Sequence, residues 1–228
     1  MQLPPLFQGT LIKRYKRFLA DVVLEDGQTI TAHVANSGAM TSTIAQGCPV
    51  WVSYHENPKR KLAYTLELSD VGSGLICVNT GWANKLTIEG IQNGVIEELQ
   101  GYESLTPEQR YGEHSRIDIL LQRGEEMCYV EVKSVTLRLG DTFAFPDAVS
   151  ARGTKHLHEL AAMKRAGHRA VMVYVIGRSE ALPFRLAHEV DPVYANAFEE
   201  ARAVGVEALV YQTCLTCNAL YLGKKKAG

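Results

Sequence analysis

The sequence predicts an α/β protein whose N-terminal part consists of β-strands alone. Over residues 1–80, short apolar runs alternate with turn residues, which is typical of antiparallel strands. From residue 81 onward, segments with helical spacing of apolar residues alternate with strand-like runs, which is typical of α/β domains. A chain of 228 residues is long enough for two such units. We therefore expect one domain over residues 1–80 and a second over residues 81–228.

Five strands are expected in the N-terminal domain, because each apolar run is short and is bounded by turn residues. Glu25, Asp26 and Gly27 form a hairpin turn between the second and third strands. The pattern favours a small barrel of the kind that binds oligonucleotides or oligosaccharides, although a small sandwich would show the same pattern. The expected strands cover residues 7–12, 18–24, 28–34, 50–54 and 64–68.

The second domain is expected to contain buried strands separated by helices. The continuous apolar run over residues 169–177 predicts a strand that is buried on both faces. Residues 83–99 have apolar side chains at near-helical spacing, and Gly94 is their weak point. The other expected elements are strands over residues 115–122, 127–137 and 206–212, and helices over residues 154–165 and 192–204.

Composition excludes several classes of protein. The formal net charge is −1, so any surface that binds nucleic acid must be local. There is no signal-peptide pattern and no apolar run of about 18 residues, so no membrane partner is expected. Cys214 and Cys217 have metal-site spacing, but no second pair of ligands completes a zinc site. These features indicate a reduced, cytoplasmic protein.

The run from Tyr129 to Lys133 contains the most informative residues. Side chains alternate along a strand, so Glu131 and Lys133 point to the same face, about 7 Å apart. Asp118 lies within the preceding apolar strand. Two carboxylates that hold a divalent cation, with a lysine beside the water and the phosphate, can build a metal-dependent phosphodiesterase site. The alternative is a row of salt bridges on the surface of two neighbouring strands.

Further ligands are expected for this cation. Glu89, in the preceding predicted helix, would supply a third carboxylate, and the carbonyl group of Val132 would supply another oxygen. A solvated glutamate is the alternative for Glu89. The expected cofactor is Mg²⁺ or Mn²⁺. Ile117 stands where a proline usually precedes the first acid of such a motif.

Basic residues suggest contacts with nucleic acid at two places. Residues 13–18 interleave cations with aromatic rings, as in barrel faces that bind single strands, whereas an edge strand protected by lysines is the alternative. Near the start of the predicted helix 154–165, Arg152, Lys155 and His156 could seat a phosphate or could simply be solvated. The expected nucleic-acid contacts are Lys13, Arg14, Tyr15, Lys16, Arg17, Lys59, Arg60, Arg152 and Lys155.

Much of the chain resembles the sugar fermentation stimulation protein A family. The strings that carry the resemblance are residues 8–21, 78–84, 115–118, 129–137 and 145–149. The resemblance implies an OB-type barrel followed by a restriction-endonuclease-like, PD-(D/E)xK domain. It also implies DNA binding and a link to the regulation of sugar metabolism, particularly of maltose. By motif, Asp118, Glu131 and Lys133 match the nuclease-like site, and Glu89 matches its helix carboxylate.

We therefore expect a DNA-binding protein with a magnesium-dependent nuclease-like site, acting as an endonuclease or an exonuclease. In one alternative the protein only occupies DNA as a regulator, and its acid-x-Lys residues are structural. In another the barrel senses a sugar or a nucleotide. The chain shows no helix-turn-helix pattern, which disfavours ordinary readout of bases in the major groove. DNA is the expected partner, and no obligate protein partner is evident.

Overall fold

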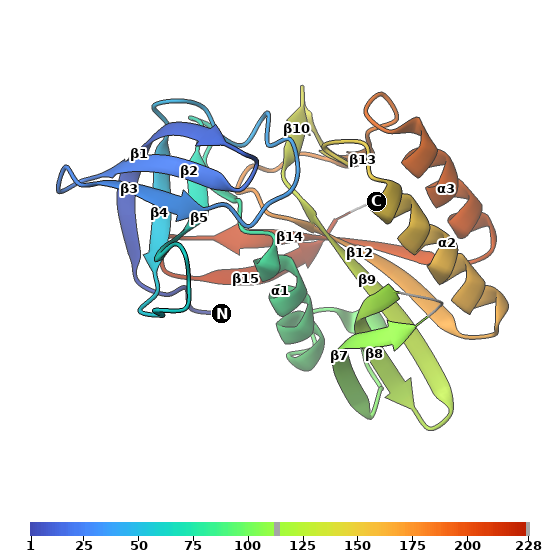
Figure 1. Ribbon diagram of the computed structural model, residues 1–228. Coiled ribbons are helices and arrows are strands. Elements are labelled where there is room, and N and C mark those ends of the chain that lie inside the picture. The colour runs from blue at the N-terminus through green and yellow to red at the C-terminus, as the bar shows by residue number, and fades with distance from the viewer. Residues whose placement is uncertain (112–114, 227–228) are drawn as a thin grey trace.

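The first six strands form a sheet that closes on itself (Figure 1). The computed structural model describes residues 1–111 and 115–226. Strand order is β3-β2-β1-β4-β5-β6, and a parallel pairing of β3 with β5 closes the barrel. The bounds are β1 (Leu6–Tyr15), β2 (Leu19–Leu24), β3 (Thr29–His33), β4 (Pro49–Tyr54), β5 (Tyr64–Asp70) and β6 (Leu75–Cys77). The five expected strands are all present, and the fold is the barrel rather than the sandwich.

Alternation along the strands fills the barrel. In β2, every second residue is buried, and these residues are Ala20, Val22 and Leu24. Residues with the same alternation in β3 and β4 meet them in one apolar core. The alternate positions remain exposed or half-buried, so the outer face of the barrel is available to carry polar and aromatic side chains.

The second domain is built on a mixed six-stranded sheet with the order β15-β14-β12-β9-β8-β7. The three central strands β9, β12 and β14 are parallel, whereas β7, β8 and β15 run antiparallel to their neighbours. The bounds are β7 (Ser104–Tyr111), β8 (Ser115–Arg123), β9 (Glu126–Val135), β12 (Arg169–Ile176), β14 (Glu207–Leu215) and β15 (Leu220–Lys225).

Helices cover both faces of this sheet. Helix α1 (Gly81–Gln92) packs on one face, whereas α2 (Ala151–Arg165) and α3 (Pro192–Ala203) lie side by side on the other (Figure 1). Strand β12 accordingly contributes Val171, Val173 and Val175 to one core and Met172 and Tyr174 to the other. The prediction that residues 169–177 form a strand buried on both faces is confirmed. None of the helices in the described part of the chain has the length and apolar character needed to cross a bilayer.

Two helix boundaries differ from the prediction by three residues or more, for local reasons. Helix α1 ends at Gln92, because Gly94 adopts a φ of 75° and breaks the pattern before a short 3₁₀ turn, η1 (Glu97–Leu99). Helix α2 begins earlier than expected, because the Ser150 hydroxyl accepts a hydrogen bond from the Gly153 N–H and caps the helix.

Five strands of the second domain were not expected. One of them, β15, pairs with β14 at one edge of the large sheet. Strand β7 is largely exposed at the edge of the sheet, so its sequence lacks an apolar pattern. The other three are short and form a separate small sheet in the order β10-β11-β13. Their bounds are β10 (Leu137–Leu139), β11 (Thr142–Phe145) and β13 (Phe184–Leu186).

A buried arginine joins the two domains. The side chain of Arg178 is 1% exposed and lies just after β12. Its Nη1 atom donates to the carbonyl oxygens of Ser42 and Thr136, each at 2.9 Å, and its Nη2 atom donates to Ser73 Oγ at 3.0 Å. Glu180 balances its charge, with 2.7 Å between Arg178 Nη2 and Glu180 Oε1. Because Ser42 and Ser73 belong to the barrel region, this network holds the barrel against the second sheet.

A buried carboxylate makes a second polar connection between the domains. Glu67, on β5, accepts hydrogen bonds from Ser53 Oγ at 2.7 Å, Asn79 Nδ2 at 2.8 Å and Trp82 Nε1 at 2.7 Å. Trp82 lies in the first turn of α1, so this carboxylate ties the start of that helix to the barrel. The position of α1 relative to both domains is therefore set by buried hydrogen bonds as well as by apolar packing.

Candidate functional site

Asp118, Glu131 and Lys133 lie together at the point where β8 and β9 separate. The ladder between these strands reaches the pair Ile119–Val130, and Asp118 lies just beyond it. There the Asp118 side chain replaces a backbone partner, because its Oδ2 atom accepts the Val132 N–H at 2.8 Å. Glu131 and Lys133 follow on the same face of β9, with Lys133 Nζ 2.6 Å from Glu131 Oε1. The alternative of a salt-bridged surface row is wrong, since Glu131 is 1% exposed.

These three side chains line a cavity of about 410 Å³ between the barrel and the second domain. A barrel loop over residues 36–38 forms one wall, and the start of α1 forms another. The loop lies so close to Asp147 that a Cβ atom added to Gly38 would be 2.0 Å from Asp147 Oδ2. Asp147 also accepts a hydrogen bond from the Met40 N–H at 3.3 Å. Both domains therefore shape the space in which Asp118 and Glu131 lie.

Glu89 does not reach this cavity, so the prediction of a third carboxylate is wrong. Its Oε1 atom lies 3.0 Å from the N-terminal amine of Met1, on another side of α1. The helix presents Asn84 to the site instead, and Asn84 Nδ2 donates to Asp118 Oδ1 at 2.8 Å. Successive helical residues are rotated by about 100°, so two residues five positions apart face different neighbours. Sequence reasoning missed Asn84, because a single asparagine in a helix carries no distinctive signal.

The Glu131 carboxylate is held by donors on one oxygen only. Its Oε1 atom accepts from Lys133 Nζ and is in contact with His156 Nδ1, from α2. Its Oε2 atom is buried and has no hydrogen-bond partner among the described residues. A buried carboxylate oxygen without a partner is costly, so this atom is suited to a ligand that enters the cavity. His156 was predicted as a possible phosphate seat, whereas its contact with Glu131 was not predicted.

The two carboxyl groups have opposite pKa shifts. Burial raises the pKa of Asp118, and the neighbouring negative charge of Glu131 raises it further. Burial also acts to raise the pKa of Glu131, but the hydrogen bond from His156 and the charge of Lys133 outweigh it, and the net shift is downward. Glu131 therefore retains its negative charge more firmly than Asp118 does.

The donors at this site fit a hard divalent cation that keeps part of its water shell. No group of three or more His, Cys, Asp or Glu side chains within residues 1–111 and 115–226 forms a ready metal cage. Mg²⁺ commonly binds through one or two carboxylates and completes its octahedron with waters and substrate oxygens. Asp118 and Glu131 would hold such an ion, and the partnerless Oε2 atom of Glu131 supports this assignment. Val132 lines the cavity, and its carbonyl group stays a predicted ligand.

Of the nine predicted nucleic-acid contacts, Arg152 alone lines the cavity, and His156, which was also predicted as a possible phosphate seat, lines it too. Lys155, on the same helix, pairs with Glu159, with 3.6 Å between Lys155 Nζ and Glu159 Oε1. In the loop between β4 and β5, Lys59 is exposed and Arg60 Nη2 donates to Thr65 Oγ1 at 2.7 Å. The roles of Lys155, Lys59 and Arg60 in binding nucleic acid stay predictions.

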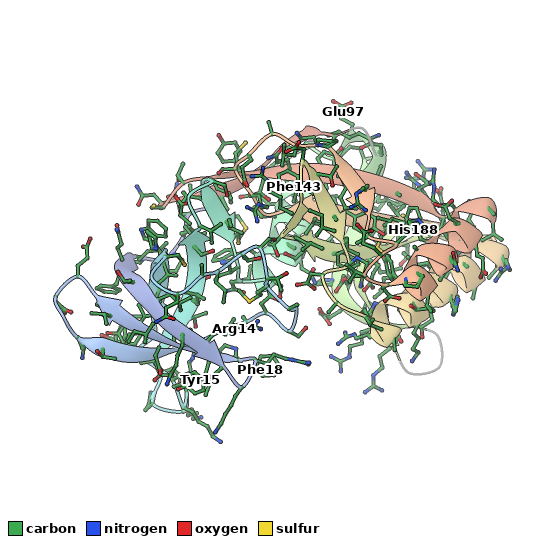
Figure 2. The ribbon with its side chains drawn as sticks, turned by 90° about the horizontal axis from the view of Figure 1, so that it is seen from above. Arg14, Tyr15, Phe18, Glu97, Phe143 and His188 are labelled. Carbon is green, nitrogen blue, oxygen red and sulfur yellow. The ribbon has the colours of Figure 1, made fainter. Side chains whose placement is uncertain are left out.

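The basic run on the barrel divides into structural and exposed members. Tyr15 donates its hydroxyl to Asp21 Oδ1 at 3.0 Å, and Lys13 Nζ lies 3.7 Å from Asp21 Oδ2. Lys16 and Arg17 occupy the loop between β1 and β2 and are exposed. Figure 2 shows Arg14, Tyr15 and Phe18 at the end of the barrel nearest the second domain. Lys13, whose side chain is 63% exposed despite its contact with Asp21, and the loop residues Lys16 and Arg17 are thus the cations of this run that are accessible to a ligand.

Arg14 supports the cavity wall through hydrogen bonds to the backbone, and its contact with phosphate stays a prediction. Its Nε atom donates to the Arg17 carbonyl oxygen at 2.8 Å. Its Nη1 atom donates to the carbonyl oxygen of Ala39 at 3.1 Å, and its Nη2 atom donates to those of Asn36 and Gly38 at 3.0 Å each. All three guanidinium nitrogens are therefore occupied by backbone carbonyl groups. The interleaved pattern in the sequence could not distinguish this use from phosphate binding.

We expect Arg14→Ala to lower the free energy of unfolding by about 2 kcal/mol, because several carbonyl groups lose a charged donor. Urea denaturation monitored by tryptophan fluorescence measures the change. Lys59→Ala removes an exposed cation from another barrel loop and is expected to change stability by less than about 0.5 kcal/mol. Equal transition midpoints for the two variants would contradict the structural assignment of Arg14.

The protein therefore belongs to the class that combines an OB-type barrel with an α/β domain carrying two acids and a lysine on adjacent strands. Family models described as "SfsA N-terminal OB domain" and "Sugar fermentation stimulation protein RE domain" match residues 12–78 and 81–218. The chain belongs to the sugar fermentation stimulation protein family. The predicted family and the predicted combination of barrel and α/β domain are confirmed.

Relatives align along almost the whole chain. The sugar fermentation stimulation protein homolog of Paramagnetospirillum magneticum is 50% identical over 220 residues, covering 96% of this chain and 93% of the relative. That of Geobacter sulfurreducens is 48% identical over 226 residues, covering 99% and 97%. A solved structure described as Pyrococcus furiosus SfsA in complex with Ca²⁺ superposes with a TM-score of 0.90 at 26% identity, covering 100% of this chain and 97% of that one.

Proposed function

We propose that this protein binds DNA and hydrolyses its phosphodiester bonds with the help of Mg²⁺ or Mn²⁺. The observation that carries the proposal is the convergence of Asp118, Glu131 and Lys133 on one cavity, with a buried Glu131 oxygen that lacks a partner among the described residues. Ca²⁺, which is named in the description of the Pyrococcus furiosus structure, also prefers oxygen ligands. That preference supports a cation site made of carboxylates.

Different residues of the chain have different roles in the proposed reaction. When bound, the divalent cation supplies Lewis-acid stabilisation of charge on the phosphate. Asp118 and Glu131 hold the cation, and the hydrogen bonds from Asn84 and the Val132 N–H keep Asp118 oriented. Lys133 places its ammonium group at the cavity wall, where it orients the attacking water and stabilises charge that develops on the phosphate. The barrel loop over residues 36–38 narrows access of bulk water to the reacting phosphate.

We propose that a single DNA strand runs from the barrel to this cavity. Lys16 and Arg17 present exposed cations at the β1–β2 loop. The next residue, Phe18, stacks on His33 with 6.5 Å between ring centroids, and its ring is 44% exposed. Arg14 then links this loop to residues 36–39, whose first three members line the cavity. Cations and stackable rings in this order suit a single strand better than a rigid duplex.

The proposal is tested by incubating end-labelled single- and double-stranded DNA with the full chain, either with Mg²⁺ or with a chelator. We expect cleavage with Mg²⁺ and none with the chelator, and a preference for the single strand. Binding of DNA without any metal-dependent cleavage would reject the nuclease and favour a regulator that only occupies DNA. A link to sugar metabolism would then depend on the DNA sequences that the protein occupies.

The β1–β2 loop gives a separate test, because strain and charge coincide there. Lys16 and Arg17 have φ angles of 47° and 65°, in the left-handed region that favours Gly and Asn. We expect Lys16→Asn with Arg17→Gly to raise the free energy of unfolding by about 1 kcal/mol. The same double variant should reduce the dependence of log K for DNA on log salt concentration by about 1.5, since two cations are lost.

A charge-only control separates the two effects. Replacing both Lys16 and Arg17 with glutamine removes the charges but retains the unfavourable φ angles. This variant should show the same reduction in salt dependence without the gain in stability. An unchanged salt slope in both variants would show that DNA does not contact this loop. Salt titrations of DNA binding by fluorescence anisotropy, together with urea denaturation, provide both measurements.

A further inference from the structure

His156 occupies a buried position between the proposed metal site and the cavity rim. It lies on α2 and is 5% exposed. Its Nδ1 atom contacts Glu131 Oε1, and its Nε2 atom lies 3.3 Å from Arg152 Nε. A continuous chain of contacts therefore runs from Arg152 through the imidazole ring to Glu131. Both Arg152 and His156 line the same cavity as Glu131.

Donor chemistry determines which nitrogen of the ring carries the proton. A guanidinium group can only donate, so the Nε2 atom of His156 must accept from Arg152. In the neutral ring the proton then resides on Nδ1, which donates to Glu131 Oε1. Lys133 Nζ lies 3.3 Å from the same Nδ1 atom, but a protonated ring nitrogen cannot accept, so the lysine donates to Glu131 Oε1 at 2.6 Å.

This arrangement has a geometric consequence for Glu131. Two donors occupy Oε1, so the carboxylate plane is held in one orientation and Oε2 is left as the oxygen available to a cation. Outer contacts of this kind keep a metal-binding side chain in the orientation it needs and influence affinity for the metal. His156 is therefore a positioning residue, because it acts through Glu131.

Arg152 gives this chain of contacts a second end. Its Nε atom is engaged with His156, whereas the structure records no hydrogen bond from its Nη atoms within the described residues. Arg152 is exposed and lies on the cavity lining, so those two nitrogens can receive a phosphate oxygen pair. A phosphate bound there would restrain the guanidinium group, and through its Nε atom would reinforce the orientation of the imidazole ring and of the Glu131 carboxylate.

We propose that Arg152 and His156 couple the binding of a substrate phosphate to the binding of the divalent cation at Glu131. The proposal rests on the function proposed above, because it concerns the same site. It adds that the cation binds more tightly when a phosphodiester occupies the cavity. By reciprocity, the cation increases the affinity for the phosphodiester by the same factor.

The experiment measures the affinity of the full chain for Mn²⁺, alone and with a short oligothymidylate. The electron paramagnetic resonance signal of free Mn²⁺ reports binding, and a sample of the oligonucleotide without protein corrects for its own uptake of Mn²⁺. We expect the oligonucleotide to tighten Mn²⁺ binding about 5- to 150-fold in the unmodified protein. We expect His156→Leu, which removes both nitrogens, to weaken Mn²⁺ binding about 10- to 100-fold.

Matched variants separate positioning from general damage to the fold. His156→Asn places an amide N–H near the position of the Nδ1 proton and should restore most of the Mn²⁺ affinity. His158→Leu makes the same change at an exposed position of α2 and should have no effect. Arg152→Ala should abolish the effect of the oligonucleotide on Mn²⁺ binding, whereas Arg165→Ala, at the far end of the helix, should retain it. Thermal unfolding without metal identifies any variant that has lost its fold.

Each outcome distinguishes this proposal from the proposed function. Unchanged Mn²⁺ affinity in a folded His156→Leu variant would overturn the positioning role while leaving the nuclease intact. A failure of His156→Asn to improve on His156→Leu would also overturn it. Retention of the coupling in Arg152→Ala would show that Arg152 does not transmit phosphate binding to Glu131. If the oligonucleotide tightens Mn²⁺ binding to the unmodified protein but DNA is never cleaved, only the proposed nuclease activity is rejected. Absence of Mn²⁺ binding would reject both.

Discussion

Replacing Asp118 with asparagine and Glu131 with glutamine should together abolish metal-dependent DNA cleavage, a loss on the order of 10³-fold or more. The reason at Glu131 is geometric. Its Oε1 atom accepts from two donors, so a glutamine would place its amide oxygen there and direct its NH₂ group to the position of the partnerless Oε2 atom. That group is a donor and carries no negative charge, so it repels a cation while the local hydrogen bonds survive.

At Asp118 the substitution should also preserve the fold. The asparagine oxygen can accept the Val132 N–H, and Asn84 can turn its amide to accept from the new NH₂ group. The variant therefore loses a charge next to Glu131 without losing its hydrogen bonds. The double variant should bind DNA about as well as the unmodified protein, because the exposed cations of the β1–β2 loop remain.

The measurement is the rate of cleavage of end-labelled single-stranded DNA with Mg²⁺, together with DNA binding in the presence of a chelator. Glu126→Gln is the matched control, since Glu126 begins the same strand as Glu131 but is exposed and pairs with Arg123. Its cleavage rate should equal that of the unmodified protein. Metal-dependent cleavage that persists in the double variant would discard the roles assigned to Asp118 and Glu131.

The second large effect is expected at the domain junction. Arg178→Met should lower the free energy of unfolding by about 3–5 kcal/mol, because it leaves buried partners without a donor. The carbonyl groups of Ser42 and Thr136 lose their hydrogen bonds, and the carboxylate of Glu180 loses its nearest cation. Glu180 has a lowered pKa: burial opposes the shift, but the hydrogen bonds and the charge of Arg178 outweigh it. Methionine keeps the apolar volume, so the loss is mainly polar.

Urea denaturation with tryptophan fluorescence and circular dichroism measures this loss and shows whether both domains unfold together. Arg165→Met, at an exposed position of α2, should change stability by less than about 0.5 kcal/mol. Adding Glu180→Leu to Arg178→Met should recover part of the loss, since it removes a half-buried carboxylate whose remaining cation, Arg138, lies 3.7 Å away. A change below about 1 kcal/mol in Arg178→Met would show that this network does not hold the domains together.

The contrast between Glu89 and Asn84 shows what helical spacing leaves undecided. The apolar pattern of residues 83–99 predicts that a helix forms and which side faces the core. It does not tell which polar residue at the edge of that side meets β8, because this depends on how the helix is rotated against the sheet. The carboxylate of Glu89 therefore seemed suited to the metal site by chemistry, whereas packing presents the amide of Asn84.

Several elements could be predicted from the amino-acid sequence because their signals are local. The alternation in the barrel strands, the doubly buried run over residues 169–177 and the shared face of Glu131 and Lys133 all follow from the geometry of a few neighbouring residues. Three contacts could be found in the folded chain alone: Asp118 accepts the Val132 N–H, His156 contacts Glu131, and Arg14 donates to the loop over residues 36–39. These contacts join segments far apart in the chain, so their partners are selected by packing of the whole fold rather than by local spacing.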